Sequence, residues 1–199
     1  MIHSVATLEG IARDLHDATG GLLPVDAFLL AQRCGFTLRA WAKGHAELRE
    51  TTIWFPAKAR DVRQQGSVAH ELGHFGQRRA GLEDCEESAR YLAGALMLPR
   101  SAFLADADAT DLDLFELMRR HPNASGEMIA ARLTQVMPAT AWVWDCGHVT
   151  RQYGLPASLP ANIVDEALLL ERPVRFEDVA AWPLIDNHHR RVIAVRRVA

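Results

Sequence analysis

Residues 70–74 read His-Glu-Leu-Gly-His, and this HExxH motif constrains the fold more than any other stretch of the sequence. Positions i and i+4 of an α-helix project from the same face, so His70 and His74 can both reach one metal ion. Glu71 is turned by about 100° around the helix axis, so its carboxylate can approach a water molecule without binding the metal. The motif therefore predicts a zinc hydrolase in which Glu71 is the general base.

The residues around the motif favour a metal site over a chance match in a chain with 9 histidines. A chance match should carry charges or helix breakers, but the neighbours are apolar and suit a buried helix: Val68, Ala69, Leu72 and Phe75. Gly73 costs the helix about 1 kcal/mol relative to alanine, and we expect this small residue to leave room for a substrate or a crossing strand. The helix is predicted to run from Asp61 to Arg79.

A catalytic zinc site has three protein ligands and one open position, so a third ligand must come from elsewhere in the chain. The helix predicted at 83–98 offers Glu83, Asp84, Glu86 and Glu87, and its apolar stripe consists of Cys85, Ala89, Leu92, Ala93 and Leu96. Glu86 projects at roughly 70° from the centre of this stripe and Glu87 nearly opposite to it, so Glu86 is the predicted ligand. The alternative interpretation of Glu86 is a plain surface carboxylate at an acidic helix start, where the helix dipole favours such residues. Glu87 stays open as the other candidate for the third ligand.

The remaining patterns predict an α+β fold with a small sheet packed on helices. Apolar residues at helical spacing indicate helices at 7–19, 24–34, 112–120, 125–136 and 162–170, with a short turn at 101–104 and an acidic stretch at 106–113. Runs of β-branched and aromatic residues indicate strands at 36–41, 51–55, 174–176 and 191–198, and a hairpin at 142–153 turning near Cys146-Gly147. We expect two domains, 1–120 and 121–199, the second being a helix pair with a β-hairpin extension.

Composition and charge argue against several classes of protein. The net charge of −3 gives no general attraction for nucleic acid. The helix pair at 112–136 could be a helix-turn-helix, but its second helix offers only Arg132 as a cation and Gln135 as a polar reader, whereas phosphate contact usually needs several cations. No apolar run is long enough to span a membrane. The three cysteines form no CxxC pair and indicate reduced thiols of a cytoplasmic protein: Cys34, Cys85 and Cys146.

Two blocks of the sequence resemble the ImmA/IrrE family of metallopeptidases. The first is Val-Ala-His-Glu-Leu-Gly-His at 68–74, and the second is the Glu-led run at 86–93 followed by Leu-Met-Leu-Pro at 96–99. The second block departs from the family pattern, which ends in Leu-Leu-Met-Pro or similar. It also carries Arg90 where many relatives have Asn or Asp, and Leu92 where Phe is common. Together with similarity at 121–133, the resemblance covers about residues 50–135.

The resemblance implies a zincin-like peptidase core with the HExxH helix at its centre and Zn²⁺ held by His70, His74 and Glu86. Family members often act in phage, mobile-element or stress-response regulation, where they cleave a helix-turn-helix repressor. The expected partner is therefore a protein substrate of this kind, and direct nucleic-acid binding is not expected. Candidates for the oxyanion-stabilising side chain, each of which we expect to be structural instead, are Tyr91, His121, His148 and Tyr153.

Two other functions stay open beside the peptidase. The chain could be a catalytically silent module that keeps the zincin fold and sequesters a regulatory partner, or a DNA-binding regulator built on 112–136. The presence of both histidines, Glu71 and a suitable Glu86 favours the peptidase.

Overall fold

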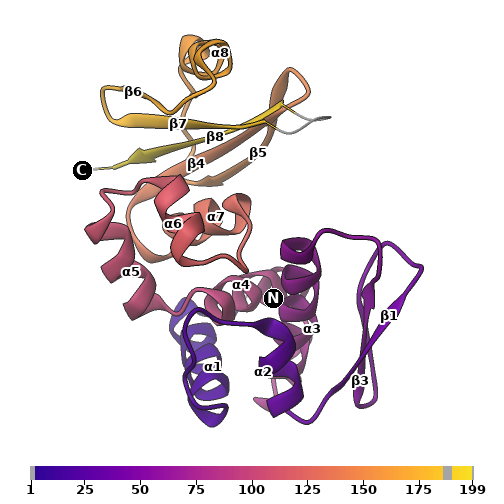
Figure 1. Cartoon of the computed structure of the whole chain (residues 1–199). Helices are drawn as coiled ribbons and strands as arrows, with labels where there is room; N and C mark the ends of the chain where they lie inside the picture. Colours follow the sequence, from indigo (N-terminus) through magenta and orange to yellow (C-terminus); the bar gives the residue numbers. More distant parts are fainter. Residues whose placement is uncertain (1–2, 186–189, 199) are drawn as a thin grey trace. The chain divides into compact units, whose positions relative to one another are not determined.

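The computed structural model describes residues 3–185 and 190–198, and over these residues the fold is α+β, as predicted (Figure 1). The chain divides into two compact units. Met1–Ala109 and Met118–Ser125 make up the first unit, and Thr110–Leu117 and Gly126–Ala199 make up the second. The first unit is a small zincin-like core and the second is a C-terminal extension. None of the described helices is long and apolar enough to cross a membrane.

The first unit is a three-stranded sheet packed on helices. Its elements are α1 (Val5–Ala18), α2 (Ala27–Arg33), β1 (Thr37–Trp41), β2 (Glu47–Arg49), β3 (Thr52–Pro56), α3 (Asp61–Arg79), α4 (Glu86–Met97) and α5 (Arg100–Ala109), and the boundary between the units falls inside α6 (Leu114–Arg120). The parallel pair β1–β3 and the antiparallel pair β2–β3 give the order β1-β3-β2, so β2 is an edge strand. Ile53 in β3 is fully buried, and the ring of Phe55 packs edge-on against Phe28 of α2, with 4.9 Å between the centroids.

α3, which carries the HExxH motif, is the central helix of the first unit and has the bounds predicted from the sequence. It contacts both α4 and β3 (Figure 1). Gly73 allows the contact with α4, because a Cβ atom at this position would lie 2.6 Å from the carbonyl oxygen of Ala89. The prediction that Gly73 leaves room for a substrate or a strand was therefore wrong. The space beside this residue is filled by the backbone of the next helix.

We expect Gly73→Ala to destabilise the protein by about 1–3 kcal/mol, because overpacking against a rigid backbone forces the two helices apart. The gain in helix propensity, about 1 kcal/mol, works in the opposite direction. Gly10→Ala is the matched control, since Gly10 also lies within a helix but has nothing within 4 Å of the position that an added methyl group would take. Urea denaturation should show a loss of stability for Gly73→Ala and none for Gly10→Ala. Equal stability of Gly73→Ala and wild type would contradict the packing argument.

Several elements of the first unit differ from the sequence expectation: α1 begins at Val5 rather than at residue 7, and α4 begins at Glu86 rather than at residue 83. α2 begins only at Ala27, because the Asp26 side chain caps it by accepting from the amides of Phe28 and Leu29 at 2.8 and 3.1 Å. α5 is a helix where a turn and an acidic stretch were expected, and its Phe103 and Ala107 are both fully buried. β2 was not predicted, and a strand of three residues is too short to show an alternating pattern.

The second unit is built on a five-stranded antiparallel sheet of order β5-β4-β8-β7-β6. Its elements are α7 (Gly126–Val136), β4 (Ala139–Asp145), β5 (His148–Gly154), α8 (Ala161–Leu170), β6 (Val174–Phe176), β7 (Val179–Ile185) and β8 (Arg190–Arg197). α8 packs on one face through a cluster that includes Trp142 and Ile163, and α7 contacts the sheet through β4, β5 and β8 (Figure 1). Both faces are thus covered, which explains the buried residues in succession along β4.

The predicted hairpin is present as β4 and β5, but it is part of this larger sheet. Cys146 and Gly147 both have positive φ, of 53° and 88°, as a two-residue type I′ turn requires. The sequence did not predict β7, because Pro183 lies within it and proline usually argues against an internal strand. In the structure Pro183 lies opposite Val192 of β8.

Candidate metal centre

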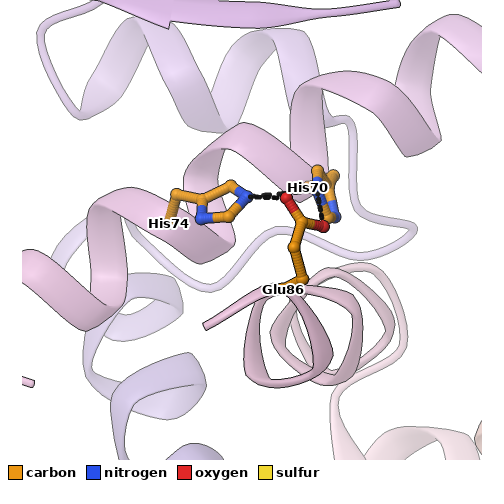
Figure 2. A group of neighbouring side chains, drawn as sticks. All are labelled: His70, His74 and Glu86. Carbon is orange, nitrogen blue, oxygen red and sulfur yellow. Dashed lines mark hydrogen bonds and ion pairs between the residues drawn. The ribbon is translucent and has the colours of Figure 1, made fainter. Parts of the chain in front are cut away.

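Three of the predicted site residues lie together between α3 and the first turn of α4. Figure 2 shows the imidazoles of His70 and His74 facing the carboxylate of Glu86. The oxygens Oε2 and Oε1 of Glu86 lie 3.3 Å from Nε2 of His70 and 3.5 Å from Nε2 of His74. The two Nε2 atoms are 3.1 Å apart. Among the described residues, this is the one group of histidine, cysteine and acidic side chains that is close enough to hold a metal ion.

The packing of α4 against α3 places Glu86 in this group. Ala89 and Leu92 of α4 are fully buried, so the helix presents one fixed face, and Gly73 permits the close approach. Glu86 is the first residue of α4, and its side chain is 63% exposed while its carboxylate reaches back to the histidines. Glu87 is also exposed and is not part of the group. Cys85 is the half-buried N-cap residue of α4 rather than a core residue of the helix stripe.

The donor set fits a divalent metal ion. Two imidazole nitrogens and one carboxylate are the ligands of a His₂Glu catalytic zinc site, and three donors leave the fourth position of a tetrahedron open. Burial lowers the pKa of His70, and the neighbouring His74 lowers it further. A lowered pKa favours the neutral imidazole, which is the form that binds metal. The lowered pKa thus prepares His70 to bind a metal ion.

Glu71 lies on the same helix but outside the group of candidate ligands. It is only 9% exposed, and its Oε2 accepts a hydrogen bond of 2.9 Å from the backbone amide of Leu48 in β2. Burial raises the pKa of this carboxyl, while His74 and the Leu48 amide act to lower it. The edge strand of the sheet thus fixes the position of the motif carboxylate.

Two residues near the site have contacts that the sequence did not predict, although Asp84 was among the acidic residues considered for the third ligand. Oδ1 of Asp84 lies 2.5 Å from Nδ1 of His74, on the ring edge opposite Nε2. Gln77 is fully buried and bonds both the amide and the carbonyl of Cys85, at 3.0 and 3.2 Å. Asp84 shows no periodic signal, because it lies in the segment between the two helices. For Gln77 the sequence did contain a signal. It is a polar residue one turn beyond His74 on a helix face that is otherwise buried, so a partner for its side chain could have been expected.

The candidates for an oxyanion-stabilising side chain have other partners. The hydroxyl of Tyr91 donates to Glu9 at 2.6 Å, and that of Tyr153 donates to Glu127 at 2.7 Å in the second unit. His121 is 5% exposed, its Nε2 lies 3.1 Å from Asp106, and burial lowers its pKa. His148 is exposed in the second unit, with Nδ1 3.3 Å from the Cys146 carbonyl. These contacts agree with the structural roles expected for the four residues.

Arg132, the one basic side chain that the second helix of the pair could offer to nucleic acid, is buried. Arg132 of α7 has no exposed surface, and its Nη1 donates to Oε1 of Gln135 at 3.3 Å. The guanidinium of Arg132 is therefore buried and bonded to Gln135.

Comparisons with known proteins give a family match and a fold likeness. Residues 39–134, which include α3 and α4, match the model of an M78 peptidase family described as the IrrE N-terminal-like domain. A solved structure described as a Mycobacterium tuberculosis transcriptional regulator has a TM-score of 0.74 and 17% identity, over 96% of this chain and 76% of that chain. At this identity the likeness concerns the fold alone. No curated protein matches the sequence.

Proposed function

Because residues 39–134 belong to the IrrE N-terminal-like domain family of M78 peptidases, as the two sequence blocks predicted, we propose that this chain is a zinc-dependent endopeptidase. The observation that carries the proposal is the convergence of His70, His74 and Glu86, whose ligand atoms all lie within 4.8 Å of one another. Glu71 beside them supplies the base that hydrolysis needs.

The proposed mechanism assigns binding to three side chains and proton transfer to a fourth. His70, His74 and Glu86 would hold Zn²⁺, which supplies Lewis-acid activation of water and of the scissile carbonyl. A carboxylate oxygen of Glu71 accepts the proton of the attacking water and then donates it to the nitrogen of the leaving amine. The position of Glu71 supports this role, because the carboxylate lies beside the candidate ligands without belonging to their group and is held by the Leu48 amide.

The edge strand β2 supports an extended polypeptide as the substrate. The amide of Leu48 points away from β3 and toward Glu71, so the free edge of the sheet adjoins the proposed base. An extended peptide can add to such an edge through backbone hydrogen bonds. Its scissile bond would then lie beside the histidines.

We further propose that the substrate is a helix-turn-helix repressor, as the resemblance to the ImmA/IrrE family implies. The burial of Arg132 argues against direct DNA binding by α7, because phosphate contact needs exposed cations. A direct test is to find the gene's neighbours, to incubate the zinc-loaded protein with any helix-turn-helix repressor encoded there, and to look for cleavage fragments by mass spectrometry. Intact repressor under conditions where the site is loaded with zinc would count against this substrate.

Zinc binding itself should be visible as stabilisation of the fold. A ligand at 100 times its Kd stabilises the folded state by about 2.7 kcal/mol, which corresponds to a rise in Tm of roughly 5–10 °C. Removal of zinc with a chelator should reverse the rise. His70→Ala should abolish it, whereas His148→Ala, which changes an exposed histidine of the second unit, should preserve it. A wild-type Tm that does not respond to zinc would contradict the proposed function.

A further inference from the structure

Asp84 contacts His74 on the side of the imidazole that faces away from the other candidate ligands. Its Oδ1 lies 2.5 Å from Nδ1, whereas Nε2 of the same ring faces Glu86 and His70 (Figure 2). An ionised carboxylate can only accept a hydrogen bond, so the ring proton lies on Nδ1. Nε2 then carries its free lone pair toward the centre of the group, which is the form that a metal ligand requires.

Asp84 is itself held in place by α3. Nη1 of Arg78, one helical turn after His74, donates to the other oxygen of Asp84 at 3.0 Å. Gln77, which is fully buried, bonds the amide and the carbonyl of Cys85, the residue after Asp84. The orientation of the carboxylate is therefore fixed by its own ion pair and by a backbone clamp on its neighbour.

The two histidines differ in whether a carboxylate supports the ring nitrogen that faces away from the site. Within the described parts of the chain, no hydrogen bond to Nδ1 of His70 accompanies its contacts with His74 and Glu86. Asp84 is not a member of the candidate ligand group, although it lies only two residues before Glu86. One short segment thus supplies a ligand on one side of His74 and a supporting carboxylate on the other.

On the basis of the proposed zinc site, we infer that Asp84 is a positioning residue, which fixes the tautomer and ring orientation of His74 for metal binding. Arg78 holds the Asp84 carboxylate by an ion pair, and Gln77 holds the backbone of the next residue, Cys85. Loss of a carboxylate that supports a metal-binding histidine typically weakens metal binding by about 10–100-fold. Asp84→Ala should therefore raise the Kd for Zn²⁺ by about this factor. Asp84→Asn, which keeps an acceptor oxygen but loses the charge, should have a smaller effect.

The test measures zinc affinity and the state of the ring separately. Zinc affinity is determined by competition with a chromophoric chelator, for the full-length wild type, Asp84→Ala, Asp84→Asn and Glu83→Ala. Glu83 is the matched control, because it is the adjacent exposed carboxylate and loses the same charge. Long-range ¹H–¹⁵N NMR of the metal-free proteins reports which nitrogen of His74 carries the proton. We expect the Nδ1–H form in wild type and Glu83→Ala, and loss of this fixed form in Asp84→Ala.

The possible results separate this inference from the proposed function. Wild-type zinc affinity in Asp84→Ala, or an equal loss in Glu83→Ala, would overturn the role of Asp84 and leave the peptidase proposal standing. If the wild type does not bind zinc, the proposed function fails, and the inference about zinc binding fails with it. A His74 ring that is Nδ1-protonated in both wild type and Asp84→Ala would overturn the inference on its own. Unfolding midpoints of the metal-free variants show whether an affinity change arises from loss of the fold.

Discussion

Glu71→Gln is expected to reduce peptide hydrolysis by about two to four orders of magnitude while leaving zinc bound, because general acid–base catalysis contributes about this much. The amide of glutamine has nearly the same shape as the carboxylate but cannot accept the proton of the attacking water. Its oxygen can still accept the hydrogen bond from the Leu48 amide, so the helix and the edge strand should keep their contact. The two measurements are the rate of substrate cleavage and the zinc content of the purified protein.

This variant also separates the peptidase from a silent binding module. A peptidase loses its biological effect together with cleavage, whereas a module that only sequesters a partner keeps its effect in Glu71→Gln. Glu47→Gln is a suitable control, because Glu47 lies in the same edge strand and pairs with Arg49 rather than with the site. Full cleavage activity in zinc-loaded Glu71→Gln would exclude Glu71 as the base.

Glu86→Gln is expected to lose zinc, whereas Glu87→Gln is expected to retain it. The Glu86 carboxylate lies 3.3 and 3.5 Å from the two ring nitrogens, and Glu87 lies outside the group. Removal of a ligand should weaken binding by more than the roughly 10–100-fold that follows loss of a supporting residue. The two variants are closely matched, because both change an exposed glutamate in the first turn of α4 by the same charge.

Metal content after dialysis and the Kd for zinc decide between the two glutamates. Retention of zinc by Glu86→Gln together with its loss from Glu87→Gln would move the third ligand to Glu87. Such a result would require the first turn of α4 to rotate when metal binds. A loss in both variants would instead indicate that the acidic start of the helix attracts the ion without a single ligating residue.

Many of the helices and strands follow from local sequence patterns. The apolar residues around the motif predict α3 with its observed bounds, because they repeat at the spacing of a helix. Cys146-Gly147 marks the hairpin turn correctly, since a two-residue turn with positive φ favours glycine. β7 was missed because it contains Pro183 and because both faces of its sheet are covered, so its residues do not alternate in burial.

The contacts that surround the site are harder to predict from the sequence than the helices and strands. The sequence analysis predicted that Gly73 leaves room for a substrate or a crossing strand. In the structure the backbone at Ala89 fills that space. The contact of Leu48 with Glu71 spans 23 residues, and that of Asp84 with His74 crosses from the interhelical segment to α3. Neither contact has a periodic signature, because each depends on where a loop or an edge strand comes to lie.

The helix that carries His70, Glu71 and His74 follows from the amino-acid sequence alone, which also narrows the third ligand to two adjacent glutamates. These conclusions are local, since the geometry of one helix fixes which side chains share a face. Tertiary packing was needed to bring the Glu86 carboxylate within 3.5 Å of both histidines, to place an edge-strand amide on Glu71, and to put Asp84 behind His74. Those relations depend on how α4 and the sheet pack against α3, and the absent side chain of Gly73 permits the closest part of that packing.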